Sequence, residues 1–274
     1  MKRFSVLISL LLFVNSCTQQ EKKKDHELLW KYEKTIKIEG VNPIGIVAVK
    51  DGFWISDGDH NRMVLIKPDG SILKEINGFD RPMHIDIKDD LLYVPEYGND
   101  RISIVNSVKK ENLSLQDSLD APAGIAVFNE EKAIVDFYNH RILYTNGSEW
   151  ISFGKEGKAN GYFYFPTDVQ ITRNEIFIAD AYNNRIQVFD KKGNFLRAIG
   201  SDQKMNAATG MYVSEEELIV TDFENNRILI FNLEGAVKQI INQDVHKPID
   251  AVIANEKLYV NNFREQSISV FTRN

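Results

Sequence analysis

Short apolar runs alternate with polar turn residues from about Lys34 to the C-terminal end of the sequence. In the unit Phe165–Gly200, the runs FPTDVQI, EIFIAD, RIQVFD and NFLRAIG are separated by short segments such as AYNN and KKG. Runs of this length that are rich in β-branched and aromatic residues predict β-strands, and the amide- and glycine-containing segments predict hairpin turns. No stretch beyond the N-terminal segment has a sustained apolar period of 3.6 residues, so we expect no helices there.

The same unit recurs along the chain. In each copy a proline or alanine is followed 14 residues later by an acidic or amide residue, and in five copies an arginine stands five residues after that. The six pairs are Pro43/Asp57, Pro82/Glu96, Pro122/Asp136, Pro166/Asp180, Ala208/Asp222 and Pro248/Asn262. A repeat of about forty residues that contains four strands is typical of a propeller blade. The sequence therefore predicts an all-β fold, a six-bladed β-propeller of four-stranded antiparallel blades.

The sixth unit is one strand short of a complete blade, because the sequence stops after SISVFTRN at Asn274. At the other end, Lys34–Gly40 (KTIKIEG) has the pattern of a fourth strand but no blade of its own. We expect this segment to pair beside Ser267–Phe271 and close the ring, since closure removes an open sheet edge. The propeller domain would then comprise residues 34–274.

The N-terminal segment has a different character. Lys2 and Arg3 precede the apolar run VLISLLLFV, which is too short to span a bilayer as a stable helix. Together they predict a signal peptide over residues 1–16. Cys17, the one cysteine of the chain, follows where a lipobox places the lipidated residue. We expect lipidation of Cys17; the alternative is ordinary signal cleavage nearby, with Cys17 incidental.

Residues 17–33 would then be a lipidated cysteine and a hydrophilic tether. This organisation predicts an exported bacterial envelope lipoprotein, located in the outer membrane if the organism is Gram-negative. The lipid anchor would be its only contact with the membrane, and we expect a monomer.

The segment DAYNNRIQVFDKKGNFLRAIG, Asp180–Gly200, resembles an NHL repeat, in which Asp is followed by Asn-x-Arg and a hydrophobic strand that ends in Phe. The resemblance covers residues 34–274 and is strongest in the fourth and fifth units. The second unit departs from the pattern with Glu96 after Pro95, and the sixth has Ser267 in place of the arginine. The resemblance implies a six-bladed propeller, in agreement with the repeat count.

Some NHL propellers bind RNA on a basic face, and the charge of this chain argues against that use. The formal net charge is −6, and removal of Lys2 and Arg3 with a signal peptide leaves 31 basic against 39 acidic residues, a net charge of −8. An acidic, exported protein lacks the electrostatic footprint of a nucleic-acid binder.

The acidic residue and the arginine of each repeat are separated by a tight turn, where a guanidinium can hold a carboxylate in a fork geometry. We interpret each pair as a structural clasp. The predicted clasps are Asp57/Arg62, Glu96/Arg101, Asp136/Arg141, Asp180/Arg185 and Asp222/Arg227.

The position two residues after each proline alternates between glycine and a potential ligand. It is occupied in turn by Gly45, His84, Gly124, Asp168, Gly210 and Asp250. The first strand of a blade is innermost, so His84, Asp168 and Asp250 would converge at the channel mouth, where they could hold a divalent metal ion or a catalytic water. The alternative is that each bonds loop backbone or channel water singly.

Aromatic residues follow the acidic positions and would lie on the same face as the channel mouth. They are Tyr97, Phe137, Tyr138, Tyr182, Phe223 and Phe263. Such rings could stack on a peptide or sugar, or pack between adjacent blades. The long loop Glu156–Phe165 would overhang this face as a lid or contact segment. His60, His140 and His246 are expected to be surface residues.

Two classes of function are compatible with these features. The favoured one is a recognition module whose upper surface binds an envelope protein, peptide or glycan, with no cofactor and no catalysis. The alternative is a metal-dependent propeller enzyme, a lyase or a lactonase-like hydrolase, with its site at the channel mouth and one divalent ion. No G-x-S-x-G motif is present to indicate a serine nucleophile.

Overall fold

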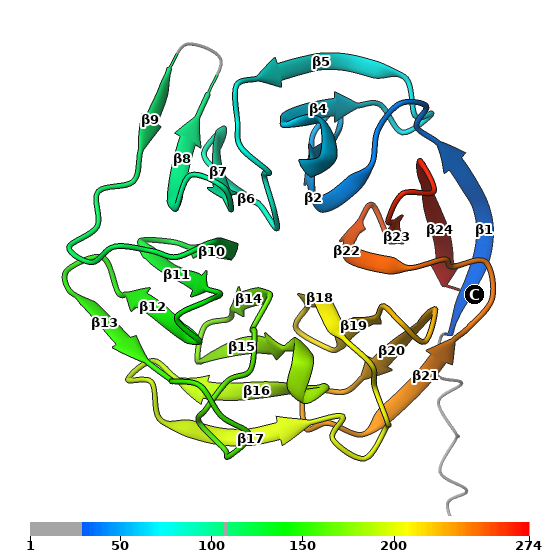
Figure 1. Cartoon of the computed structure of the whole chain (residues 1–274). Coiled ribbons are helices and arrows are strands. Elements are labelled where there is room, and N and C mark those ends of the chain that lie inside the picture. Colours follow the sequence, from blue (N-terminus) through cyan, green and yellow to red (C-terminus); the bar gives the residue numbers. More distant parts are fainter. Residues whose placement is uncertain (1–28, 107–108, 274) are drawn as a thin grey trace, which may run out of the picture.

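The computed structural model describes residues 29–106 and 109–273, and within these ranges the chain forms a closed ring of six four-stranded antiparallel sheets around a central axis (Figure 1). This is the predicted six-bladed propeller. The predicted signal peptide, residues 1–16, and Cys17 lie outside the described residues. No helix in the described part of the chain is long and apolar enough to cross a membrane.

The first three blades follow one another along the chain. Blade 1 consists of β2 (Pro43–Val49), β3 (Gly52–Asp57), β4 (Arg62–Ile66) and β5 (Ile72–Asn77). Blade 2 consists of β6 (Asp86–Lys88), β7 (Leu91–Glu96), β8 (Arg101–Val105) and β9 (Lys110–Asn112). Blade 3 consists of β10 (Pro122–Phe128), β11 (Glu131–Asp136), β12 (Arg141–Thr145) and β13 (Trp150–Phe153).

The other three blades complete the ring. Blade 4 consists of β14 (Asp168–Ile171), β15 (Glu175–Asp180), β16 (Arg185–Asp190) and β17 (Phe195–Ile199). Blade 5 consists of β18 (Ala208–Val213), β19 (Leu218–Asp222), β20 (Arg227–Phe231) and β21 (Val237–Ile241). Blade 6 consists of β22 (Pro248–Ala254), β23 (Lys257–Asn262), β24 (Ser267–Arg273) and β1 (Trp30–Lys37).

Two faces of the ring are used below. The upper face carries the turns between the second and third strands, including the 3-10 turns η1 (Gly58–His60) and η2 (Ala181–Asn183), and the loops from one blade to the next. The lower face carries the hairpins between the first and second strands. The first strand of each blade is the innermost one (Figure 1). It runs from the upper to the lower face, because it follows a loop between blades and ends at the hairpin to the second strand.

The ring is closed by β1, which pairs antiparallel with β24 as the fourth strand of blade 6. The strand begins at Trp30, upstream of the predicted start at Lys34. Trp30 lies opposite Arg273, and its indole Nε1 donates a hydrogen bond to Glu217 Oε1 in blade 5 at 3.1 Å. These contacts come from residues far away in the sequence, so local patterning did not indicate them.

The hydrophobic core consists of layers between neighbouring blades. One layer joins Ile46, Phe53 and Ile55 of blade 1 to Tyr259 and Ile268 of blade 6, and five further clusters join the other adjacent pairs. Alternate residues of the central strands supply both sides of each layer because side chains alternate across a sheet. The outer strands are much more exposed; in β5 only Ile76 is half-buried. Burial between blades therefore fixes the inner strands around the axis.

Candidate functional site

Each of the five predicted clasps is present as an ion pair on the upper face. The nearest nitrogen–oxygen distances range from 2.6 Å, between Arg227 and Asp222, to 3.1 Å, between Arg101 and Glu96. All five acidic side chains are fully buried. In the sixth blade, Asn262 takes the acidic position and donates to Ser267 Oγ at 3.2 Å.

The clasp carboxylates also hold the loops between blades. In blades 2 to 5 an oxygen of each accepts the backbone N–H of a residue sixteen positions earlier, at 2.7–2.9 Å, from Asp80, Asp120, Tyr164 and Asn206. Every such carboxylate thereby accepts hydrogen bonds both from its own blade and from the preceding loop. These contacts are those of a scaffold rather than of a reactive centre.

A second repeated hydrogen bond links neighbouring blades, and it explains why His140 is buried. The turn residue before each clasp arginine has a positive φ, and its side chain accepts the backbone N–H of the residue that precedes the next blade. Asn61 accepts from Arg81, Asn184 from Ala207 and Asn226 from Lys247, each at 2.8–2.9 Å.

His140 occupies this position in blade 3, with Nδ1 accepting the N–H of Phe165 at 3.0 Å. The prediction that His140 is a surface residue was therefore wrong: it is 8% exposed and its ring is stacked on Tyr164. His246 is exposed, as expected, and the His60 side chain is about half exposed beside Asp57.

Several of the predicted aromatic side chains form one connected cluster across blades 2, 3 and 4. We call this cluster the aromatic platform; it consists of Tyr97, Phe137, Tyr138, Tyr164, Phe165 and Tyr182. Successive ring centroids lie 4.7–5.8 Å apart, within the range of favourable aromatic pairs.

Two residues of the platform are strongly exposed: Tyr138 is 50% and Tyr182 is 60% accessible to solvent. The hydroxyl of Tyr97 donates to that of Tyr138 at 2.8 Å, and the Arg81 guanidinium lies 4.9 Å above the Tyr97 ring. Phe223 and Phe263 do not join the platform. They form a separate pair 5.9 Å apart in blades 5 and 6, and each lies beneath a cation, Lys247 or Arg264.

Tyr164 and Phe165 were not among the aromatic residues predicted for this surface, although their loop was. The loop is hydrogen-bonded to side chains of blade 4. Arg185 donates to Ala159 O at 2.9 Å, and the Gln187 amide donates to Tyr162 O at 2.7 Å. The clasp of blade 4 therefore positions the centre of the platform.

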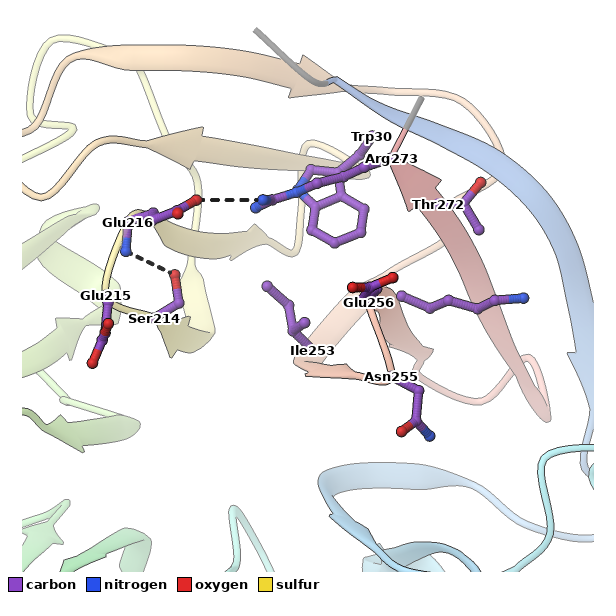
Figure 2. Close-up of a pocket in the computed structure, with 10 residues that line it drawn as sticks. Trp30, Ser214, Glu215, Glu216, Ile253, Asn255, Glu256, Thr272 and Arg273 are labelled. Atoms are coloured by element: carbon purple, nitrogen blue, oxygen red, sulfur yellow. Dashed lines mark hydrogen bonds and ion pairs between the residues drawn. The ribbon is translucent and has the colours of Figure 1, made fainter.

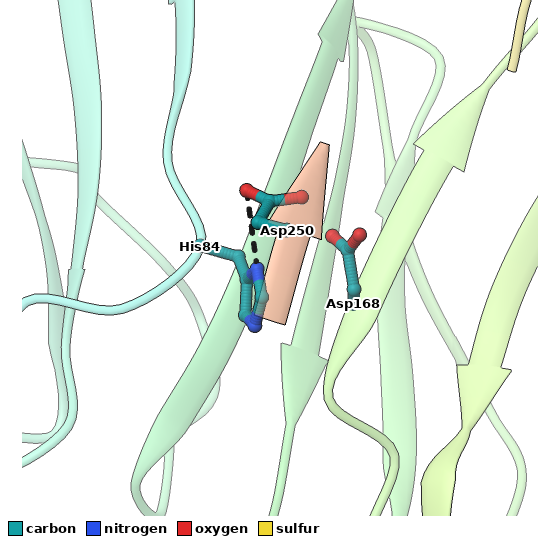
Figure 3. Close-up of side chains that lie close together, drawn as sticks. All are labelled: His84, Asp168 and Asp250. Atoms are coloured by element: carbon teal, nitrogen blue, oxygen red, sulfur yellow. Dashed lines mark ion pairs between the residues drawn. The ribbon is translucent and has the colours of Figure 1, made fainter. Parts of the chain in front are cut away.

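The second candidate site lies on the axis, where the structure brings together His84, Asp168 and Asp250 (Figure 3). One ligand atom of each residue lies within 4.8 Å of the ligand atoms of the other two. All three side chains are buried, at 2–5% exposure, so they line the interior of the ring and not an open mouth. Metal binding by these residues stays a prediction.

The electrostatics of this cluster follow from burial and proximity. Burial raises the pKa of Asp168 to about 7, with the Asp250 charge adding to the increase and His84 opposing it. Burial acts to lower the pKa of His84, but the interactions with Asp250 and the attraction to Asp168 together outweigh burial and the pKa is raised. A positive charge placed among these groups is thus favoured.

Beneath the cluster, toward the lower face, lies an axial cavity of about 240 Å³. Asp86, Asp168 and Asp250 border it together with Gln170 and Met211. Three larger hollows of about 630, 540 and 1120 Å³ lie between adjacent blades on the lower face.

The hollow of about 630 Å³ lies between the hairpins of blades 5 and 6 and is bordered by Trp30 and Arg273 (Figure 2). Arg273 pairs with Glu217, and its guanidinium lies 4.5 Å above the Trp30 ring. Trp30 and Arg273 hold the closing strand β1 in place, so we assign these residues of the hollow a structural role. Nothing in the repeat pattern predicted it.

Comparison with known proteins places this architecture among the six-bladed propellers. Residues 163–270 match the family DUF5128, described as a 6-bladed beta-propeller. Protein lin-41 of Caenorhabditis elegans is 43% identical over 47 residues, which is 17% of this chain and 4% of that protein's length. The stretch shared with that relative is thus about one repeat long.

Solved structures with the same fold include virginiamycin B lyase from Staphylococcus aureus. A catalytically inactive histidine-to-alanine form with quinupristin has a TM-score of 0.64 and 16% identity, with 89% of both chains covered. The selenomethionine-substituted form has a TM-score of 0.66 and 15% identity, with 89% of this chain and 99% of that one covered. At this identity the likeness concerns the fold alone.

Proposed function

We propose that the protein is a bacterial envelope lipoprotein whose propeller is a recognition module, and that the aromatic platform binds a peptide segment of a partner protein. The observation that carries the proposal is the connected platform on the upper face, with Tyr138 and Tyr182 half or more exposed. Large rigid aromatic side chains give contact area at low entropic cost, and tyrosine and arginine are enriched at protein interfaces.

The position of the N-terminal strand supports an orientation in which the aromatic platform faces away from the membrane. Trp30 pairs with Arg273 at the lower end of β24, at the same end as the hairpin Asn255–Glu256. A tether attached to Trp30 would therefore leave from the lower face, and anchoring at Cys17 would leave the platform turned away from the bilayer. This arrangement suits capture of a partner in the envelope space.

Peptide selection tests the proposal. A random peptide library is selected on the purified protein, and the enriched peptides are titrated against the double variant Tyr138→Ala/Tyr182→Ala. We expect affinity to fall at least about 10-fold, because interface aromatics commonly contribute more than about 1 kcal/mol each. Tyr32→Ala is the matched control, since Tyr32 is also exposed, at 43%, but lies on the closing strand.

Equal peptide binding by wild type and the double variant would show that the platform is not the site. Binding to a glycan array that is lost in the double variant, with no peptide enriched on wild type, would replace the peptide by a sugar ligand.

A metal-dependent enzyme is the second candidate function. The likeness of the fold to virginiamycin B lyase and the cluster of His84, Asp168 and Asp250 support it. Incubation of the protein with quinupristin and a divalent ion, followed by mass spectrometry, is the direct test. Cleavage that is lost in Asp168→Asn would favour the enzyme, and an intact substrate leaves the recognition module as the proposed function.

A further inference from the structure

Three aspartates of the even-numbered blades have the same structural role next to the axis. Each accepts the N–H of its own following residue and one N–H from the first strand of the next blade. Asp86 accepts from Val127 at 2.6 Å, Asp168 from Met211 at 2.8 Å and Asp250 from Ile46 at 3.0 Å. This role accounts for the three carboxylates. It does not account for His84.

His84 lies close to two of these carboxylates and at ion-pair distance from Asp250, without a hydrogen bond to either. Its Nδ1 is 3.4 Å from Asp250 Oδ2 and makes no hydrogen bond, although the side chain is only 4% exposed (Figure 3). A buried polar atom without a hydrogen bond costs free energy, and a ligand bound at the His84 Nδ1 would remove this cost. The third aspartate, Asp86, lies outside the cluster and serves as an internal comparison.

We infer that His84, Asp168 and Asp250 bind one divalent transition-metal ion, of the class of Mn²⁺, Co²⁺ or Zn²⁺, with its remaining coordination positions toward the axial cavity. Imidazole together with carboxylates suits these ions, whereas Ca²⁺ prefers six to eight oxygen ligands. A dication also offsets two carboxylates that are buried side by side. The inference is independent of the aromatic platform and of the peptide-binding proposal.

The distances are compatible with such an ion after an adjustment of the ligands. In a tetrahedral site, two ligands about 2.1 Å from a common ion lie about 3.4 Å apart. Since the ligand atoms here lie within 4.8 Å of one another, binding requires them to approach by up to about 1.4 Å. Rotation of the His84 ring about its broad terminal torsion supplies part of this movement.

The carboxylates are already oriented for the ion. Asp168 receives two backbone N–H groups, from Val169 and Met211, and Asp250 receives two, from Ala251 and Ile46. Each carboxylate oxygen retains a lone pair, so these bonds fix the ligands without using them up.

The glycines of the odd-numbered blades make the arrangement possible. A Cβ on Gly210 would lie 2.3 Å from Ile249 O, and one on Gly45 would lie 2.7 Å from Met83 O. Only glycine lets the segments carrying Asp250 and His84 approach the neighbouring strands this closely. The axial cavity of about 240 Å³ then has room for several waters, which would complete the coordination of the ion.

The metal itself is the probe for the test. The purified protein is stripped with a chelator and titrated with Co²⁺, whose visible absorption reports nitrogen and oxygen ligation, and with Mn²⁺, Zn²⁺ and Ca²⁺ by calorimetry. We expect one Co²⁺, Mn²⁺ or Zn²⁺ per chain and weaker binding of Ca²⁺. Loss of one ligand in His84→Ala or Asp168→Asn should weaken binding about 100-fold or more, because a side chain that contacts the metal matters at least as much as the groups that orient it.

Two comparison variants separate metal binding from general effects on folding. His60→Ala removes a histidine that also lies beside a carboxylate, 2.8 Å from Asp57, and should bind metal like wild type. Asp86→Asn removes a capping aspartate that borders the axial cavity and should lower thermal stability, with a smaller effect on metal affinity than His84→Ala or Asp168→Asn.

The competing occupant is a proton shared among the three side chains. If that is the true state, wild-type protein binds no ion at micromolar concentrations and shows no Co²⁺ absorption band, and the inference is overturned. It is also overturned if His84→Ala, verified as folded by circular dichroism, binds Co²⁺ as tightly as wild type. Should His84→Ala fail to fold, His84→Gln is used instead.

Discussion

Arg185→Ala is the perturbation whose effect can be worked out most fully from the structure. The Arg185 side chain is 10% exposed, and its Nε donates to the fully buried Asp180 at 2.9 Å. It also donates to Asn160 Oδ1 at 3.2 Å and to the carbonyls of Ala159 and Tyr162 at 2.9 and 3.2 Å. The substitution therefore removes a buried ion pair and three of the bonds that hold the loop Glu156–Phe165.

Breaking a buried ion pair by removal of one partner costs about 3–5 kcal/mol. Asp180 retains donors from the backbone of Tyr164 at 2.8 Å and from the amides of Asn183 and Gln187, both at 2.9 Å. We therefore expect the lower end, about 3 kcal/mol, which corresponds to a fall in Tm of roughly 6–12 °C for a domain of this size.

Arg101→Ala is the matched comparison from blade 2. The Arg101 side chain is 36% exposed, and Glu96 would retain Lys110 at 3.0 Å, Asn99 at 2.9 Å and Ser103. Solvent screening and the second cation reduce the expected cost to about 1 kcal/mol.

Unfolding by guanidinium chloride and by heat, followed by circular dichroism, measures both variants against wild type. Equal costs for the two arginines would refute the argument that burial and loop contacts decide the contribution of each clasp. A cost below about 1 kcal/mol for Arg185→Ala would show that the loop is held by other contacts. Peptide binding by Arg185→Ala should fall as well, since Tyr164 and Phe165 lie at the end of the same loop.

Three further outcomes are expected. Deletion of residues 29–37 should expose β24 as an open edge and produce aggregation, and a monomer of unchanged Tm by light scattering and calorimetry would contradict closure by β1. Cys17→Ala should move the protein from the membrane fraction to the soluble fraction, and unchanged fractionation would contradict lipid anchoring. Burial of Glu96 opposes ionisation, but the hydrogen bonds from Arg101 and Ser103 outweigh burial and hold the pKa of Glu96 at about 2. The contribution of Glu96 to folding stability is therefore present above its ordinary pKa of 4.5 and is lost as the pH falls toward 2. Glu96→Gln should therefore lower stability at pH 7 and flatten the loss of stability between pH 4.5 and 2, which a variant as pH-sensitive as wild type would disprove.

The architecture was predictable because one spacing is kept in every blade. The interval from Pro166 to Asp180 fixes the first hairpin, and the arginine five residues later fixes the turn, so the strands, their order and the clasps follow from local information. The burial of His140 could also have been predicted from the repeat, since Asn61, Asn184 and Asn226 occupy the same position in other blades. Its amide-like role as an acceptor explains why it is buried.

Other features depend on contacts that no local pattern records. Trp30 belongs to β1 because Glu217 and Arg273, from the other end of the chain, bind and cover its indole. The alternation of glycine with His84, Asp168 and Asp250 indicated which residues face the axis. It did not indicate that they are fully enclosed, nor that the His84 Nδ1 is left without a hydrogen bond, because both depend on the packing of three separate blades.

The pairing of β1 with β24 sets an order of events for a chain that emerges from its N-terminus. β1 emerges first, yet its partner extends to Arg273, so blade 6 cannot assemble before nearly all of the described chain is available. Contacts so distant in sequence form slowly and late, after blades 1 to 5 have folded from their own hairpins. Any product that stops early would present two unpaired blade faces and be a ready substrate for proteases, so ring closure also distinguishes complete molecules from incomplete ones.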